Sequence, residues 1–251
     1  MIDLHCHVLP GVDDGVRTLE EAVELARAAE ADGVTAIAAT PHVRDDYPTS
    51  AETMEAKVAQ VNDAVRAAGI GVEILRGGEV ALDFLPELGD SVVRFGLGGN
   101  PKLLLLEFPY YGWPLNFADV VFRLRARGVV PLIAHPERNT DARESPERLR
   151  ELADGGAYFQ ITAASLDGRL GRPTQASALR LVELGFAHVI ASDAHHPGIR
   201  ATGMTAAREA LGDEELGRWL TEDVPAALVA GEEPPPRPEG RPQRGGLRFF
   251  R

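Results

Sequence analysis

The first fifteen residues of the chain concentrate side chains that can bind metal ions. They read MIDLHCHVLPGVDDG, with His5 and His7 one residue apart and Asp13 and Asp14 in the following loop. Because successive side chains of a strand point to opposite faces, His5 and His7 project together, about 7 Å apart along the strand, and Cys6 projects the other way. Two imidazoles on one face can reach the same metal ion, although two polar residues at a strand end would show the same spacing.

Five further apolar runs also deliver His, Asp or Glu at the point where the run ends. These runs are TAIAAT, VEILRGGEV, LLLLEF, VVPLIAH and HVIASDAH, and the residues are His42, Glu79, Glu107, His135, Asp193 and His195. Each residue alone is typical of a solvated side chain where a strand meets its loop. Together with His5 and His7, however, they include five of the seven histidines in the chain, which favours a shared site.

Seven apolar runs, the six above and YFQIT, alternate with amphipathic stretches. One such stretch has helical periodicity, with Thr18 and Glu21 in a capping-box pattern at its start and Gly33 at its end. Near-continuous apolar strands indicate a parallel sheet that is buried on both faces, and therefore an α/β fold. No G-x-G-x-x-G follows the first run, so a dinucleotide-binding sheet lacks support.

A barrel explains the polar strand ends better than a flat sheet does. A flat sheet of seven strands would spread these residues over roughly 30 Å, at about 4.8 Å per strand. A closed barrel brings all carboxyl ends of the strands to one face, where barrel enzymes carry their active sites. We therefore predict a barrel domain over residues 1–231, followed by a Pro/Gly/Arg-rich tail over residues 232–251.

Composition narrows the function further. The net charge of −12 repels phosphate backbones, so we expect no nucleic-acid partner. The single cysteine, Cys6, cannot form an intrachain disulfide, which fits a reducing compartment. The amino terminus resembles no signal peptide, and no apolar run approaches the roughly 18 residues that span a bilayer, so we expect a cytoplasmic protein without membrane insertion.

Five imidazoles and four carboxylates are more ligands than one ion needs. A catalytic zinc ion typically takes three protein ligands and water, so this set suits two or three ions. Mixed nitrogen and oxygen ligands without thiolate suit Mn²⁺, Fe²⁺ or Zn²⁺. Such clusters generate hydroxide from bound water near neutral pH. They also bind the attacking oxygen and the leaving oxygen when a nucleophile displaces a group at phosphorus.

Two arginines follow the predicted ligands. Arg138 lies in the HPER sequence after His135, and Arg200 follows SDAHHPGI. Either one alone would be interpreted as an ordinary surface residue. Beside a cluster of cations they indicate an anionic substrate, because a guanidinium group binds phosphate through two parallel hydrogen bonds.

The motifs DLHCH, DDG, TPH, GGEV, LLLEF, IAHPER and SDAHH resemble, in this order, those of the PHP-domain metallophosphatases. Within that superfamily the chain is most similar to the bacterial manganese-dependent protein tyrosine phosphatases of capsule and exopolysaccharide gene clusters, and the segment QITAASLDGRLG is also typical of them. The resemblance covers nearly the whole chain.

This resemblance implies a distorted seven-stranded (β/α) barrel of the PHP type with a trinuclear metal site, most simply of Mn²⁺. It selects Asp14 rather than Asp13 as a ligand, and it makes Arg138 and Arg200 the residues that contact phosphate. It also implies a phosphotyrosine-bearing partner, namely the tyrosine-rich tail of a capsule tyrosine autokinase. The implied metal ligands are His5, His7, Asp14, His42, Glu79, Glu107, His135, Asp193 and His195.

Two segments depart from the pattern of the family. They are RDDYPTS after His42 and PYYGWPLN after Glu107, and both are candidates to line the substrate cleft. The predicted mechanism is metal-assisted hydrolysis of phosphotyrosine without a covalent enzyme intermediate. The C-x5-R loop of cysteine-dependent tyrosine phosphatases is absent, since Val12 stands where Cys6 would require the arginine.

Three alternatives remain at this point. The first is a small-molecule phosphomonoesterase of the same superfamily, acting on a substrate such as histidinol phosphate. The second is a C–N hydrolase whose metals are bridged by a carbamylated lysine. That function is disfavoured because the fourth strand ends in Glu107 and has Lys102 at its start. The third is a non-catalytic, metal-binding regulatory module.

Overall fold

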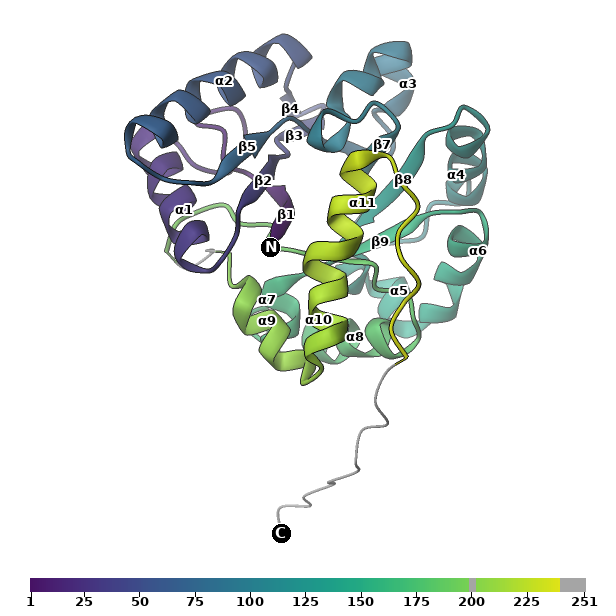
Figure 1. The fold of residues 1–251 in the computed structure, drawn as a ribbon. Coiled ribbons are helices and arrows are strands. Elements are labelled where there is room, and N and C mark those ends of the chain that lie inside the picture. The colour runs from purple at the N-terminus through teal and green to yellow at the C-terminus, as the bar shows by residue number, and fades with distance from the viewer. Residues whose placement is uncertain (199–201, 240–251) are drawn as a thin grey trace.

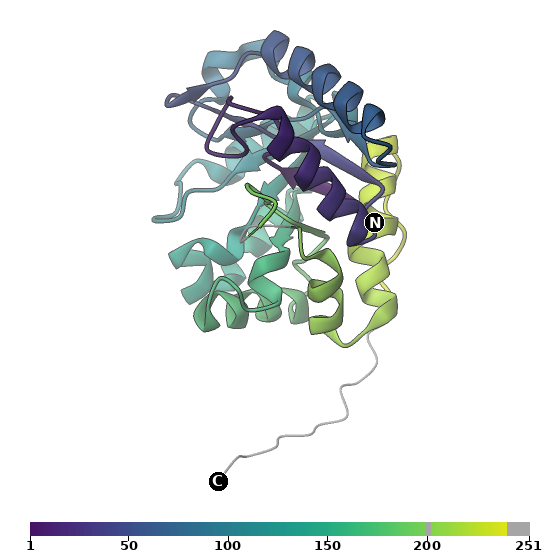
Figure 2. The ribbon, with the colours of Figure 1, turned by 90° about the vertical axis from the view of Figure 1, so that its left-hand side faces the viewer.

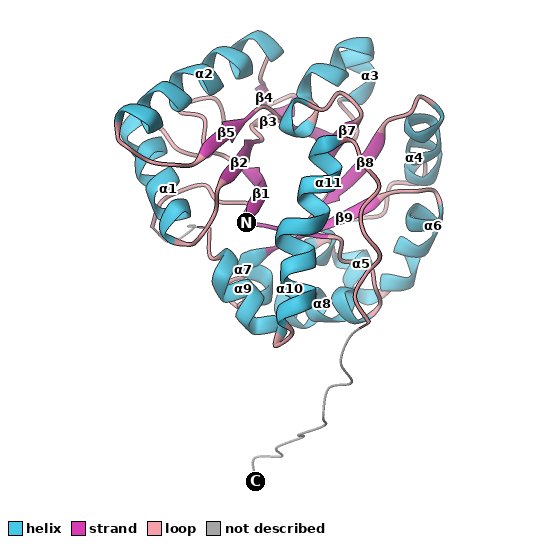
Figure 3. Ribbon diagram, viewed as in Figure 1, coloured by secondary structure: helices cyan, strands magenta, loops and turns pink. Residues whose placement is uncertain are grey.

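A computed structural model describes residues 1–198 and 202–239. The strands gather in the middle of the molecule and the helices form a rim around them (Figure 3). This arrangement follows from the alternation of apolar runs and amphipathic stretches along the chain, since strands such as β7, β8 and β9 are buried almost along their whole length. Arg200 and residues 240–251 of the predicted tail lie outside the described residues.

The strands form two sheets. The first is parallel and has the order β1-β2-β5. The second has the order β10-β9-β8-β7-β6-β3-β4 and is parallel except for the antiparallel pair β3–β4. The strands are β1 (Ile2–Cys6), β2 (Ala36–Ala39), β3 (His42–Arg44), β4 (Tyr47–Pro48), β5 (Glu73–Leu75), β6 (Glu79–Ala81), β7 (Leu103–Glu107), β8 (Val130–Ala134), β9 (Tyr158–Thr162) and β10 (Val189–Ala191).

The predicted α/β fold is confirmed, and each of the seven apolar runs contains a strand. The hairpin of β3 and β4 was not predicted. It forms because the polar residues Asp45 and Asp46 make a tight turn, after which Tyr47 pairs with Arg44. The two strands are only three and two residues long and show no apolar alternation, so periodicity does not reveal the hairpin.

Backbone hydrogen bonds also join the end of β1 to the segment after β10. The amide of His7 donates to the carbonyl of Ala194 at 2.9 Å, and the amide of Asp193 donates to the carbonyl of His5 at 2.8 Å. A parallel bridge pairs Cys6 with Ala194 in the same place. The first and last strands of the chain are therefore neighbours.

Helices cover the outside of the strands and cross one end of them (Figure 1). Figure 2 shows α10 and α11 together on the side where the chain starts. The helices are α1 (Leu19–Ala31), α2 (Ala51–Ala67), α3 (Leu85–Leu88), α4 (Phe117–Ala126), α5 (Thr140–Glu144), α6 (Leu149–Asp154), α7 (Ala163–Leu166), α8 (Arg172–Glu183), α9 (Met204–Leu211), α10 (Glu214–Arg218) and α11 (Val224–Ala230).

Helix α1 illustrates how local sequence sets these boundaries. The hydroxyl of Thr18 accepts a hydrogen bond from the amide of Glu21 at 3.2 Å, as the capping pattern predicts. The carboxylate of Glu21 reaches back and accepts from the amide of Arg17 at 2.6 Å. Gly33 follows the helix with a φ of 82°, a left-handed conformation that glycine adopts without strain.

Residues 232–239 form no helix or strand, but they are held against the domain. The indole of Trp219 donates to the carbonyl of Pro235 at 2.9 Å. The guanidinium of Arg237 donates to the carbonyls of Val182 at 2.7 Å and Ala187 at 3.2 Å. The boundary between a barrel domain and a tail at residue 231 stays a prediction.

No helix within residues 1–198 and 202–239 has both the length and the apolar composition that crossing a bilayer requires.

Candidate metal centre

The carboxyl ends of the strands converge, and the structure brings all nine predicted ligands together. They fall into four overlapping groups in which the donor atoms of each group lie within 4.8 Å of one another. Six of the nine lie at or just beyond the carboxyl ends of β1, β7, β8 and β10, His42 and Glu79 are the first residues of β3 and β6, and Asp14 reaches the cluster from the loop after β1. The groups are His7, Asp14, His42 and His195; His5, His7 and Asp193; His5, Glu79 and His135; and His42, Glu79 and Glu107.

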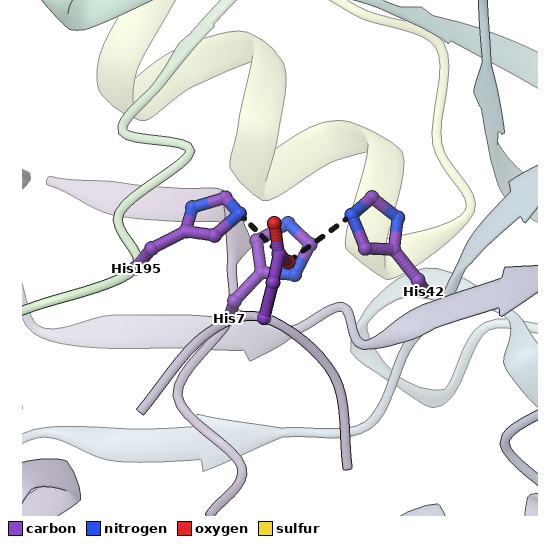
Figure 4. Close-up of side chains that lie close together, drawn as sticks. His7, His42 and His195 are labelled. Carbon is purple, nitrogen blue, oxygen red and sulfur yellow. Dashed lines mark ion pairs between the residues drawn. The ribbon is translucent and has the colours of Figure 1, made fainter. Parts of the chain in front are cut away.

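The first group surrounds Asp14. One oxygen of this carboxylate lies 3.4 Å from Nε2 of His42 and 3.3 Å from Nε2 of His195. Figure 4 shows His42 and His195 directed toward a common region on either side of His7. Asp14 is the most exposed of the nine, with 44% of its side chain accessible, so this group forms the open side of the cluster.

Glu79 is the centre of the buried side. Its Oε2 atom lies 2.9 Å from Nδ1 of His42, 3.3 Å from Nε2 of His5 and 3.5 Å from Nε2 of His7. Its Oε1 atom lies 2.9 Å from Nε2 of His135. Burial opposes ionisation of this carboxyl, but the surrounding histidines hold its pKa well below the usual value. A single buried carboxylate therefore belongs to two of the groups and contacts histidines of the other two.

Asp193 completes the cluster from the far side of β1. Its Oδ1 atom lies 3.5 Å from Nε2 of His5 and 3.4 Å from Nε2 of His7, and these two nitrogens are 3.3 Å apart. Asp193 and His135 are the only non-glycine residues with positive φ in the described part of the chain, at 50° and 35°. Such conformations cost about 1–3 kcal/mol each and concentrate at functional sites. The backbone at both positions is therefore strained next to the cluster.

The separations within the groups suit divalent cations. Ligand atoms that each lie about 2.1 Å from one ion are roughly 3.0–3.4 Å from each other at octahedral or tetrahedral angles. The contacts of Glu79, His5 and His7 span 2.9–3.5 Å. The residues present fit more than one ion.

The electrostatics of the open side depend on the same carboxylates. Burial lowers the pKa of His42, but hydrogen bonds to Asp14 and Glu79 outweigh it and raise that pKa to about 9. Hydrogen bonds to His195 and His42 lower the pKa of Asp14. Burial and the charge of Glu79 raise the pKa of Glu107. Because only neutral imidazole binds a metal ion, ions at this site would compete with protons.

Two polar residues behind the cluster orient the first two histidines. Nδ1 of His7 lies 2.8 Å from the carboxylate of Asp13, and Nδ1 of His5 donates to the amide oxygen of Gln160 at 3.0 Å. These bonds leave Nε2 of each ring to face the cluster, which is the usual arrangement of metal-binding histidines. The sequence left Asp13 and Asp14 as alternatives by spacing, and the structure places Asp13 behind His7 and Asp14 within the cluster. Gln160 was missed, although a glutamine in the middle of the apolar run YFQIT is a signal that could have revealed it.

Both unusual loops lie beside the cluster. In the first, the ring of Tyr47 stacks on His42 at 5.7 Å, and Arg44 donates to Oε1 of Glu107 at 2.7 Å. In the second, the ring of Tyr110 stacks on His135 at 5.6 Å. Two phenol rings therefore lie beside the site, one against His42 and the other against His135.

Arg138 lies at the edge of the cluster, in the short 3₁₀ turn Pro136–Arg138. Its guanidinium contacts the carboxylate of Asp193 and lies 4.8 Å from the centre of the Tyr110 ring. The sequence placed it near the ligands, and the structure agrees. The other predicted arginine, Arg200, lies outside the described residues.

Cys6 is turned away from the cluster, as strand alternation predicts. It is fully buried in the hydrophobic core, and its thiol lies 3.6 Å from the carbonyl of Ala194. Burial raises the pKa of the thiol well above its usual value, so a reactive thiolate is disfavoured.

The fold and the cluster together define a class, namely α/β proteins that carry a candidate metal centre at the carboxyl ends of their strands. Residues 1–224 match the family model for capsular polysaccharide synthesis, CpsB/CapC. The chain therefore belongs to the CpsB/CapC family.

Characterised relatives agree with this membership. The chain is 35% identical over 232 residues to the tyrosine-protein phosphatase YwqE of Bacillus subtilis, a match that covers 91% of each chain. It is 34% identical over 198 residues to a putative tyrosine-protein phosphatase, CapC, of Staphylococcus aureus, covering 78% of this chain and 77% of that one.

A solved structure shows the same fold. It comes from work on YwqE of Bacillus subtilis and CpsB of Streptococcus pneumoniae, described as unique metal-dependent tyrosine phosphatases. It superimposes with a TM-score of 0.87 at 35% identity and covers 96% of this chain and 100% of its own.

Proposed function

We propose that this chain is a metal-dependent tyrosine phosphatase, a phosphoric monoester hydrolase that acts on phosphotyrosine in proteins. The observation that carries the proposal is the cluster of four overlapping His, Asp and Glu groups in a chain whose relatives are named tyrosine-protein phosphatases. The net charge of −12 makes local cations necessary for binding a phosphate monoester, and this cluster would supply them.

The nine clustered residues would hold two or three ions. Mn²⁺ is the first choice and Fe²⁺ or Zn²⁺ the next, since the donors are imidazole and carboxylate without thiolate. When bound, such ions lower the pKa of water and offset the negative charge of a phosphoryl group. Asp13 and Gln160 would keep Nε2 of His7 and His5 directed at the ions through the hydrogen bonds described above.

Other residues of the chain would act on the substrate directly. Arg138 would donate to the non-bridging oxygens of the phosphoryl group, since it lies at the edge of the cluster beside Asp193. We assign Arg200 the same role from the sequence. Tyr47 and Tyr110 would contact the phenyl ring of phosphotyrosine from either side. Cys6 has no role, because it is buried and directed away.

We also propose that the two sheets are one distorted seven-stranded barrel of the PHP type. β2 and β3 are separated only by residues 40–41, and β5 and β6 only by residues 76–78, so each pair can be one interrupted strand. The hydrogen bonds between β1 and residues 193–194 support closure of the ring. A closed ring explains how side chains from so many strands meet.

The physiological substrate follows from the family. We propose a phosphotyrosine-bearing tail of a capsule or exopolysaccharide tyrosine autokinase as the partner, because the family model describes capsular polysaccharide synthesis. The cytoplasmic location expected from the sequence stays a prediction, which cell fractionation would test.

Comparison of three substrates on the Mn²⁺-loaded protein tests the proposal. We expect efficient hydrolysis of a phosphotyrosine peptide, weak hydrolysis of a phosphoserine peptide and weak hydrolysis of histidinol phosphate. Preferential hydrolysis of histidinol phosphate would replace the proposal with a small-molecule phosphatase. Absence of all three activities at full metal occupancy would favour a non-catalytic metal-binding module.

A further inference from the structure

A surface groove leads away from Arg138 between α5 and α8. It consists of two hollows of about 390 and 420 Å³ that share Thr140 and Arg143. The inner hollow begins at Arg138 and Tyr110, beside the metal cluster, and the outer hollow extends to Arg180. Helices α5 and α8 lie together in the lower part of Figure 1. The groove is therefore continuous with the proposed phosphate site.

The inner hollow is cationic in a strongly acidic protein. Its charged lining residues are Arg138 and Arg143, and no carboxylate lines it. Arg138 contacts Asp193, whereas Arg143 is exposed and makes no side-chain hydrogen bond or ion pair within residues 1–198 and 202–239. The outer hollow adds Arg180, which pairs with Glu183, and one acid, Glu144. The positive charge is concentrated next to the metal cluster.

The other lining residues suit an extended peptide. Thr140 and Thr174 offer hydroxyl groups to a peptide backbone, and Leu170 and Tyr111 leave 39% and 81% of their surface exposed for apolar contact. A small phosphate monoester bound at the cluster would leave this groove empty. A peptide whose phosphotyrosine enters the cluster must continue over the rim, and this groove begins at that rim.

We infer that the groove binds the segment of the substrate protein that flanks the phosphotyrosine, and that Arg143 selects an acidic side chain in that segment. The inference rests on the proposed function and specifies its substrate class as acidic phosphotyrosine peptides. Arg180 adds a weaker contact further along, because Glu183 and Glu144 offset part of its charge.

Kinetics with three substrates test this inference. They are a phosphotyrosine peptide with Asp and Glu flanks, the same peptide with Ala flanks, and p-nitrophenyl phosphate. We expect Arg143→Glu to lower kcat/KM for the acidic peptide about tenfold, mainly through KM, since one partly exposed charge-assisted contact contributes on the order of 1 kcal/mol. Turnover of p-nitrophenyl phosphate should stay at the parental value, and Arg180→Glu should have a smaller effect.

Arg66→Glu is the matched control. Arg66 lies on α2, with 76% of its side chain exposed and Asp63 as its one ion-pair partner among the described residues, so the variant makes the same charge change away from the groove. It should leave all three substrates unaffected. Added salt should reduce the difference between parent and Arg143→Glu, because exposed charges are screened.

Binding of a fluorescent acidic phosphopeptide to the metal-loaded protein separates the two proposals. Weaker binding to Arg143→Glu, measured by anisotropy, supports the groove even if no substrate is hydrolysed, in which case the proposed function fails alone. Equal binding and equal kcat/KM for the parent and Arg143→Glu would overturn the groove. An equal loss with p-nitrophenyl phosphate would also overturn it, since Arg143 would then act on the catalytic cluster.

Discussion

Strand β10 has a histidine at each end, and the two ends differ in chemistry. His188 precedes the strand among the rings of Tyr158, Phe159 and Trp219, where burial lowers its pKa to about 4. At the carboxyl end, Asp193 and His195 join a cluster of carboxylates and imidazoles, in which the pKa of His42 is raised to about 9. Burial disfavours the charged form of both rings, so burial alone does not decide the direction of the pKa shift.

Nearby carboxylates make the difference. His42 contacts Asp14 and Glu79, whereas His188 forms no ion pair with a carboxylate among the described residues and its Nδ1 accepts from the amide of Phe159 at 3.3 Å. A group of imidazoles that gains protons from neighbouring carboxylates is also a group that can exchange those protons for metal ions. The carboxylates of the cluster therefore mark the candidate chemistry, whereas the residues around His188 at the amino end of β10 provide packing.

The largest difference should appear when His42 and His188 are each replaced by alanine. We expect His42→Ala to lower phosphotyrosine turnover about 10³-fold or more and to reduce the bound metal per chain, because it removes a donor shared by two groups. His188→Ala should keep the metal content and the turnover of the parent. Assays of folded protein with elemental analysis check both variants, and equal losses of metal would break the comparison.

The next largest difference is expected between two arginines, Arg138 beside the cluster and Arg237 at the other end of the strands. Arg138→Ala should lower kcat/KM for phosphotyrosine about 10²–10³-fold at unchanged metal content, because one preorganised contact to transition-state charge commonly contributes about 3–4 kcal/mol. Arg138→Lys should recover only part, since a point charge does not reproduce the paired hydrogen bonds of guanidinium.

Arg237→Ala is the control at the opposite end. Arg237 donates to backbone carbonyls beside Trp219, so we expect its loss to affect thermal stability and leave kcat/KM unchanged. Parental turnover of Arg138→Ala would show that Arg138 is a surface residue with no role in catalysis.

His188 should also make the protein less stable in acid. Its folded pKa of about 4 lies below the usual 6.5, so the unfolded chain takes up a proton first as the pH falls. The free energy of unfolding therefore has its full value above pH 6.5. It falls between pH 6.5 and 4, by ~3 kcal/mol at most. Denaturant unfolding of parent and His188→Leu across this range checks the prediction. An unchanged pH dependence in the variant would contradict it.

The sequence predicted the cluster better than the path of the strands. His5, Glu79 and Asp193 could be predicted because apolar runs mark strands and barrel closure brings strand ends together. A glutamine in the run YFQIT draws attention to Gln160, but the hydrogen-bond partners of Gln160 and Arg44 could not be predicted, because they depend on how a strand and a hairpin far away in the sequence approach His5 and Glu107. The splitting into two sheets likewise depends on short interruptions that periodicity does not resolve.

The smallest effect is expected for the residue between the first two histidines. Cys6→Ser should leave turnover within a fewfold, because the thiol faces the core and not the cluster. A loss of roughly 10⁴-fold or more, typical of a missing nucleophile, would contradict hydrolysis without a covalent intermediate. Thermal unfolding controls for the cost of placing a hydroxyl in the core.

Removal and return of metal test the central claim most directly. The protein is stripped with a chelator, its metal content is measured, and turnover of a phosphotyrosine peptide is followed as Mn²⁺ is added back. We predict no turnover in the stripped protein and recovery that saturates at two or three ions per chain, with Fe²⁺ and Zn²⁺ as comparisons. Full turnover by metal-free protein would contradict the account.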